Sequence, residues 1–170
     1  MRLYSVFVWV TLSALAALLQ SQVPTIPATA GETLSGKKIV LSDALRGHAA
    51  VLVAGFSHDG GMGCGDWMKA IRADPSLAGV DVYEVAMLEG APGLFRGMIK
   101  SAMRKGMSSE EQQRSVVLTQ DDKLWQAYFA VSNPQEPQVM LLDAQGNVVW
   151  RGHGAANALE PQLRNAVSSH

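Results

Sequence analysis

The stretch Ala49-Ala50-Val51-Leu52-Val53-Ala54-Gly55-Phe56 decides the fold of this chain. Its near-continuous apolar character predicts a strand that is buried on both faces of a parallel or mixed sheet. The glycine-rich segment Ser57-His58-Asp59-Gly60-Gly61-Met62-Gly63-Cys64-Gly65 follows, and a helical pattern begins at Asp66. In open α/β sheets, ligands and chemistry gather outside the carboxyl ends of the strands. The predicted loop between Phe56 and Asp66 is therefore the candidate site.

Strand and helix patterns alternate outward from this stretch. A Gly-Lys turn within 33–42 predicts a hairpin, and further strands are predicted at 80–88, 116–118, 137–143 and 148–151, the last two paired as a hairpin. Helical patterns occupy 66–73, 94–103, 119–131 and 155–167. We therefore predict a three-layer α/β fold, with a central mixed sheet flanked by helices and an N-terminal β-hairpin extension.

The composition excludes several classes of protein. The 170 residues are 48% hydrophobic and 17% charged, with 14 Lys and Arg against 15 Asp and Glu, which is typical of a globular domain and not of a nucleic-acid-binding one. The single cysteine excludes an internal disulfide, a CxxC redox pair and a multi-cysteine zinc site.

The N-terminus has the pattern of an export segment. Arg2 precedes an uncharged apolar run over 3–19, and Ala28-Thr29-Ala30 fits a small-x-small cleavage site. We expect residues 1–30 to be a signal peptide or an uncleaved signal anchor. Residues 31–170 would then form one exported domain, either periplasmic or anchored to the outer face of the inner membrane.

Two motifs carry a resemblance to the thioredoxin fold in its redoxin and TlpA-like forms. Leu34-Ser35-Gly36-Lys37-Lys38-Ile39-Val40-Leu41-Ser42-Asp43 resembles the G-K-x-V-x-L-S-D entry of redoxin-type domains, and 137–146 resembles their P-x-x-x-x-x-D-x-x-G segment. Phe56 ends the strand before the site loop, as in those proteins. The resemblance implies that the bond before Pro137 is cis and that this proline faces the site. The alternative is a trans proline that starts an edge strand.

Other short motifs are similar to the mitochondrial ATP synthase assembly factors of the ATP-ten family. They are Met103-Arg104-Lys105 with Arg114, Val131-Ser132-Asn133, Val139-Met140-Leu141-Leu142-Asp143 and Val149-Trp150-Arg151-Gly152. This resemblance implies a role in assembling a membrane complex.

Cys64 is the candidate catalytic residue. It lies eight residues after Phe56, where the thioredoxin resemblance places the second cysteine, and Gly61 occupies the attacking position. Since a glycine cannot attack a disulfide, dithiol exchange within one molecule is excluded. A single thiol just before a helix that starts at Asp66 could have a lowered pKa and serve a one-cysteine peroxidase or reductase. We favour the alternative, a partly buried cysteine that packs the helix start and is not catalytic.

The glycine-rich segment also holds soft metal ligands. His58, Asp59, Met62 and Cys64 form a compact group whose imidazole, thioether and thiolate suit Cu(I). The resemblance to copper-delivery thioredoxin folds implies His153 as the distant histidine, so copper handling is a second alternative. We expect instead that His58 is solvated and that the protein holds no metal or cofactor.

The helical pattern over 94–103 separates two kinds of side chain. Apolar residues fall on one side (Leu94, Phe95, Met98, Ile99, Ala102 and Met103) and basic residues on the other (Arg96, Lys100, Arg104 and Lys105). We expect the methionine-rich side, with Met87 and Met107, to join the core and the basic side to be solvated. The alternatives are a hydrophobic groove for a client protein, and contact of the basic side with anionic lipid or an acidic partner.

The sequence as a whole favours a non-catalytic binding or assembly factor for a membrane or periplasmic protein complex. Its partner is expected to be a protein and not a nucleic acid, contacted through Pro137, Trp67, Phe56 and Asp59. Membrane association through the N-terminal segment is a further expectation.

Overall fold

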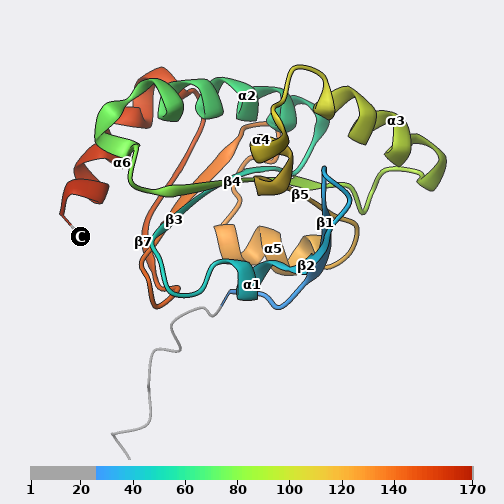
Figure 1. The fold of residues 1–170 in the computed structure, drawn as a ribbon, viewed down its shortest axis with the longest axis horizontal. Coiled ribbons are helices and arrows are strands. Elements are labelled where there is room, and N and C mark those ends of the chain that lie inside the picture. Colours follow the sequence, from blue (N-terminus) through green and yellow to red (C-terminus); the bar gives the residue numbers. More distant parts are fainter. Residues whose placement is uncertain (1–25, 170) are drawn as a thin grey trace, which may run out of the picture.

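A computed structural model describes residues 26–169 of the chain (Figure 1). Its strands are β1 (Ala30–Thr33), β2 (Lys38–Val40), β3 (Ala50–Gly55), β4 (Asp81–Met87), β5 (Ser115–Leu118), β6 (Gln138–Leu142) and β7 (Val148–His153). Its helices are α1 (Leu41–Ala44), α2 (His58–Ala73), α3 (Gly93–Arg104), α4 (Ser109–Arg114), α5 (Asp122–Phe129) and α6 (Ala156–Ser168), with a short 3-10 turn at Pro75–Leu77.

The strands form one mixed sheet in the order β2-β1-β5-β4-β3-β6-β7. β3 runs parallel to β4 and antiparallel to β6, and all six of its residues are buried. β1 and β2 form the predicted N-terminal hairpin, and β6 and β7 form the predicted C-terminal one. The apolar stretch at 49–56 is thus the central strand that its sequence predicts.

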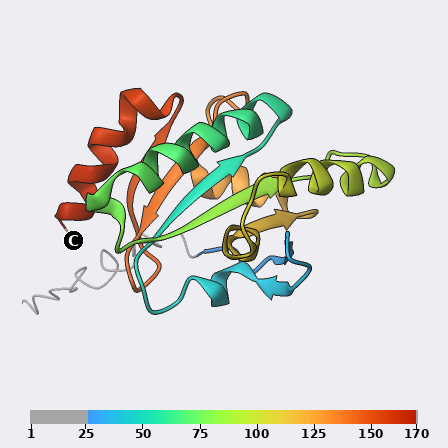
Figure 2. The same cartoon turned by 45° about the horizontal axis from the view of Figure 1, so that its top comes forward.

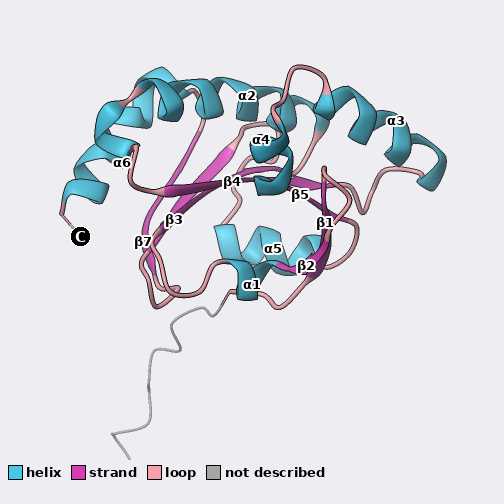
Figure 3. Ribbon diagram, in the orientation of Figure 1, coloured by secondary structure: helices cyan, strands magenta, loops and turns pink. Residues whose placement is uncertain are grey.

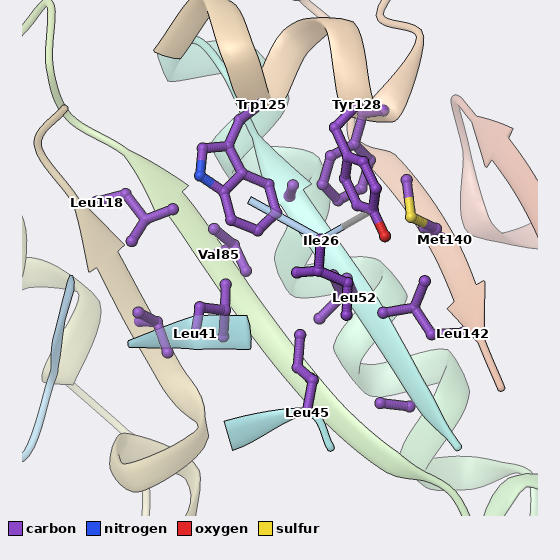
Figure 4. Close-up of a cluster of buried hydrophobic side chains, with 14 of the residues drawn as sticks. Ile26, Leu41, Leu45, Leu52, Val85, Leu118, Trp125, Tyr128, Met140 and Leu142 are labelled. Atoms are coloured by element: carbon purple, nitrogen blue, oxygen red, sulfur yellow. The ribbon is translucent and has the colours of Figure 1, made fainter. Parts of the chain in front are cut away.

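Helices cover both faces of this sheet, which confirms the three-layer α/β prediction (Figure 3). Because side chains alternate along a strand, β3 supplies both cores. Leu52 packs with α5 and α1 on one face (Figure 4), while Val51 and Val53 pack with α2 and α6 on the other.

The segment just before β1 belongs to the folded domain. Ile26 is buried in the core beneath α5. Thr29 is buried as well; its Oγ1 accepts a hydrogen bond of 2.9 Å from Trp125 Nε1 and donates one of 2.8 Å to Asp121. Thr29, the middle residue of the cleavage motif at 28–30, is therefore packed in the domain, although Ala28 and Ala30 are exposed. The predicted apolar segment at 3–19 falls outside the described residues.

The largest difference from the sequence prediction concerns α3. None of its residues is buried, and it projects beyond the end of the sheet (Figure 2). Met87 does join the core, but Leu94 and Met98 are exposed, so the expectation that the apolar side of this helix is core was wrong. Within residues 26–169, no helix combines the length and the apolar character needed to cross a bilayer.

Candidate functional site

The glycine-rich segment is the first part of a helix and not a loop. α2 begins at His58, eight residues before the predicted start at Asp66. Ser57 caps it, because its Oγ accepts a hydrogen bond of 3.1 Å from the amide of Gly60. The Ser57 hydroxyl also donates to Gln135 at 3.2 Å, which joins this helix end to the segment before β6.

The glycines are explained by close packing rather than by flexibility. A Cβ at Gly55 would lie 2.6 Å from the Cα of Gly61, and one at Gly60 would lie 2.8 Å from the carbonyl oxygen of Pro134. A Cβ at Gly63 would lie 2.8 Å from the ring of Pro137. Real Cβ atoms do not approach so closely, so only glycine lets the end of β3, the start of α2 and the 134–137 segment meet.

Cys64 lies on the buried side of this helix. Its side chain is 1% exposed and belongs to the core that contains Val51, Val53 and Trp67. The thiol donates a hydrogen bond of 3.3 Å to the carbonyl oxygen of Gly60, one turn earlier. Burial, and secondarily the charge of Glu84, raise the pKa of the Cys64 thiol far above its usual value. Because the thiolate is the reactive form, this cysteine has the properties of an inert core residue.

Glu84, on β4, is a buried acid near Cys64 that the sequence analysis missed. It accepts a hydrogen bond of 3.1 Å from the hydroxyl of Ser115. Burial raises the pKa of the Glu84 carboxyl, while the Ser115 hydrogen bond and the charge of Arg72 oppose that rise. The sequence did contain a signal for this buried acid: Glu84 stands among apolar residues of a predicted strand. Because side chains alternate between the two faces of a sheet, its side chain faces α2.

Pro137 lies at the expected place but with a different peptide bond. The described residues contain no cis peptide bond, so the expectation of a cis bond before Pro137 was wrong. The proline precedes β6, where its missing N–H interrupts no ladder, and its ring packs on Gly63. Its carbonyl oxygen accepts a hydrogen bond of 3.1 Å from the amide of Gly154. β6 lies between β3 and β7, so it is not the edge strand of the alternative prediction either.

A groove of about 620 Å³ lies beside Pro137. Small residues line much of it, together with three acids and no Lys or Arg: Gly63, Asp66, Ala70, Glu136, Pro137, Gly154, Ala155, Ala156, Asn157 and Glu160. Glu136 pairs with His153, and Glu160 bonds Arg164 at 2.8 Å. Gly63 and Pro137 place this groove beside the predicted site.

The other predicted partner-binding residues differ in exposure. Trp67 is fully buried, and its Nε1 donates a hydrogen bond of 2.7 Å to Gly154, so it supports the groove from beneath and presents no surface to a partner. Phe56 is half-buried and packs edge-on against Phe129, with ring centroids 5.6 Å apart. Asp59 is exposed in the first turn of α2.

The predicted soft ligands do not converge. His58 and Met62 are exposed and lie one turn apart on α2, whereas Cys64 lies about 200° around the helix from Met62. His58 contacts Asp59, and His153 contacts Glu136. Across residues 26–169, no three His, Cys, Asp or Glu side chains form a group that could hold a metal.

Comparisons with known proteins identify the fold. BsSco, a member of the Sco family of cytochrome c oxidase assembly proteins, matches with a TM-score of 0.56 at 15% identity, over 87% of this chain and 94% of that one. A thiol:disulfide interchange protein from Bacteroides sp. matches with a TM-score of 0.56 at 19% identity, over 85% and 86% of the two chains. The exposed lipoprotein thioredoxin of Streptococcus pneumoniae gives 0.52 at 17% identity, over 80% and 97%.

The fold is therefore thioredoxin-like, as the redoxin-type motifs predict. No protein-family model and no curated protein sequence matches the chain. The resemblance to the ATP-ten family is not shown by these comparisons.

Proposed function

We propose that this chain is an exported thioredoxin-fold protein that binds a partner polypeptide without thiol chemistry, as an assembly factor for a membrane or periplasmic complex. The observation that carries the proposal is the position of Cys64. Its sulfur is buried and bonded to Gly60. Gly61 stands where the thioredoxin resemblance places the attacking cysteine. Peroxide reduction, thiol exchange and copper binding through this residue would each require a sulfur that a substrate can reach.

The groove beside Pro137 is the proposed binding surface. It combines a rigid wall, made by the Pro137 ring on Gly63, with the carboxylates of Asp66, Glu136 and Glu160. No Lys or Arg is among its lining residues, but Lys69, His153 and Arg164 lie beside the three acids, so the groove has a modest preference for a basic polypeptide segment. The assembly role rests on the ATP-ten motifs in the sequence and is the finer part of the proposal.

Export remains a proposal that rests on the apolar run at 3–19. Since Ile26 and Thr29 are packed in the domain, we place the end of any removed segment before Ile26 and not at Ala30. The mature domain would then keep the hydrogen bond from Trp125 Nε1 to the hydroxyl of Thr29.

The test uses a photo-crosslinking amino acid at Asn157, which lines the groove. The matched control is Asn165, an exposed asparagine on the same helix that is not among the groove's lining residues. In cells that express the full chain, we expect a defined protein adduct from position 157 and not from 165. The adduct should persist with Cys64→Ala and weaken with Glu136→Gln plus Glu160→Gln.

Two results would contradict the proposal. One is an identical set of adducts from both positions, which would mean that the groove selects nothing. The other is loss of the adduct in a Cys64→Ala protein that remains folded by circular dichroism, because the thiol would then be needed for the interaction.

A further inference from the structure

Lys100 and Arg104 of α3 face the domain, with Ile99 and Met103 half-buried beside them, while the other apolar residues of the helix face solvent. Lys100 Nζ contacts a carboxylate oxygen of Glu32 on β1 at 2.7 Å. Arg104 Nε donates a hydrogen bond of 2.6 Å to the carbonyl oxygen of Leu34, just after β1. The cations that would be solvated on an ordinary surface helix therefore fasten this helix to the domain.

Within residues 26–169, no element covers the opposite, apolar side of α3. Leu94 is 84% exposed and Met98 is 67% exposed, while Phe95 and Ala102 are exposed beside them. These residues recur at helical spacing, so they form one continuous stripe. A stripe of large apolar side chains on the outside of a domain marks an interaction surface.

Between the exposed Glu89 and Glu110, α3 and its flanking turns carry charge of one sign. Residues 90–109 contain four Lys or Arg and no Asp or Glu. Lys105 is exposed at the end of the helix, and Lys37 and Lys38 are exposed in the neighbouring β1–β2 hairpin. A second copy of the chain would bring the same positive charge to the contact, whereas an anionic surface would be attracted.

The shape of α3 also bears on what could cover it. It projects from the end of the molecule (Figures 1 and 2), and none of its residues lines the groove beside Pro137. An amphipathic helix with Phe and Leu on one side and Lys and Arg around it is the arrangement that lies in the interface of an anionic bilayer.

We propose that α3 docks the domain onto an anionic lipid bilayer, with Leu94, Phe95 and Met98 inserted among the lipid headgroups and Lys105 beside the phosphates. This goes beyond the proposed groove function and does not depend on it, because the stripe and the groove are made of different residues. It also does not depend on the N-terminal segment.

The test places an environment-sensitive NBD fluorophore on the full chain at Met98→Cys in a Cys64→Ala background. Met62→Cys is the matched control, since Met62 is 70% exposed but lies on α2. With phosphatidylglycerol-containing vesicles we expect a blue shift and a several-fold rise in emission at position 98 and no change at 62. Pure phosphatidylcholine should leave both unchanged, and 0.5 M salt should weaken the response.

Two further variants and one control separate the apolar and electrostatic contributions. Leu94→Gln should reduce partitioning at position 98, whereas Leu124→Gln, an exposed leucine on α5, should not. Lys105→Gln should reduce partitioning about fivefold, the effect of about one kcal/mol for one cation near a charged surface.

Three results would overturn the proposal. The first is no response at position 98 to anionic vesicles. The second is an equal response at 98 and 62, which would place the membrane contact elsewhere. The third is a change at 98 that follows protein concentration without lipid, which would identify a second copy as the occupant.

Discussion

The sulfur of Cys64 lies 3.3 Å from the carbonyl oxygen of Gly60, inside the core between α2 and the sheet. In a fold whose solved relatives include thiol:disulfide interchange proteins, the only cysteine of this chain faces inward. The first turns of α2 turn it away from solvent, because Gly60 and Gly63 let the helix begin directly after Ser57 and pack against Pro134 and Pro137.

Two glycines of α2, Gly61 and Gly63, should change the stability of the protein in opposite directions when each is replaced by alanine. Gly63→Ala places a methyl group 2.8 Å from the rigid ring of Pro137, and we expect a loss of about 1–3 kcal/mol in the free energy of unfolding. Gly61→Ala adds its methyl group to open space within the same helix, and we expect a gain of up to about 1 kcal/mol from helix propensity. Urea unfolding of the two variants checks both signs; equal destabilisation would show that the ring contact is not the cause.

The Thr29 side chain should be needed for the full stability of the domain. Thr29→Val removes the acceptor of Trp125 Nε1 and the donor to Asp121, so we expect a loss of about 1–3 kcal/mol. Thr119→Val, at an exposed position, is the matched control and should change stability little. If both variants unfold at the same urea concentration as the parent, Thr29 is not an integral part of the domain.

Glu84 should make the stability of the protein depend on pH. Its pKa is raised in the folded state, so its contribution to stability is fully present below the unfolded pKa and is lost as pH rises through the folded value. Glu84→Gln removes that dependence and keeps an acceptor for Ser115. We expect the variant to gain about 1 kcal/mol relative to the parent at pH 7.5, the scale of burying a polar group that is imperfectly paired.

The gain from Glu84→Gln should shrink at pH 4, where the native carboxyl is neutral as well. Glu110→Gln removes the same charge from an exposed position and serves as the control. Urea midpoints at the two pH values give the comparison, and a gain that does not change with pH would rule out titration of Glu84 as its origin.

Much of the fold could be predicted from the chain because its signals are local. The apolar run at 49–56 predicts a buried strand, and the glycines at 36 and 146 predict hairpin turns. Gly36 and Gly146 do adopt the positive φ that such turns require. The redoxin-type motifs around them indicated the same fold. The strand pattern, the turn residues and the motifs all indicated the same structure, and for that reason the predicted sheet and hairpins were confirmed.

The site was harder to predict because distant contacts decide it. Glycine lowers helix propensity, so 60–65 has the local signature of a loop, yet tertiary contacts to Pro134 and Pro137 favour a helix there. Periodicity revealed the two sides of α3 but not which one faces the domain, because Glu32 and Leu34, which bond its cations, lie far away in the sequence.

The central claim, that Cys64 is buried and chemically inert in the folded protein, is tested most directly by its rate of alkylation. Iodoacetamide is added to the native full chain and to the chain in urea, at pH 7 and pH 9, and modification is followed by intact mass. Because the thiol is reached only through unfolding, native modification should be at least about a thousandfold slower than in urea. Modification of the native chain at the rate of a free thiol, with rapid consumption of added peroxide, would contradict the account.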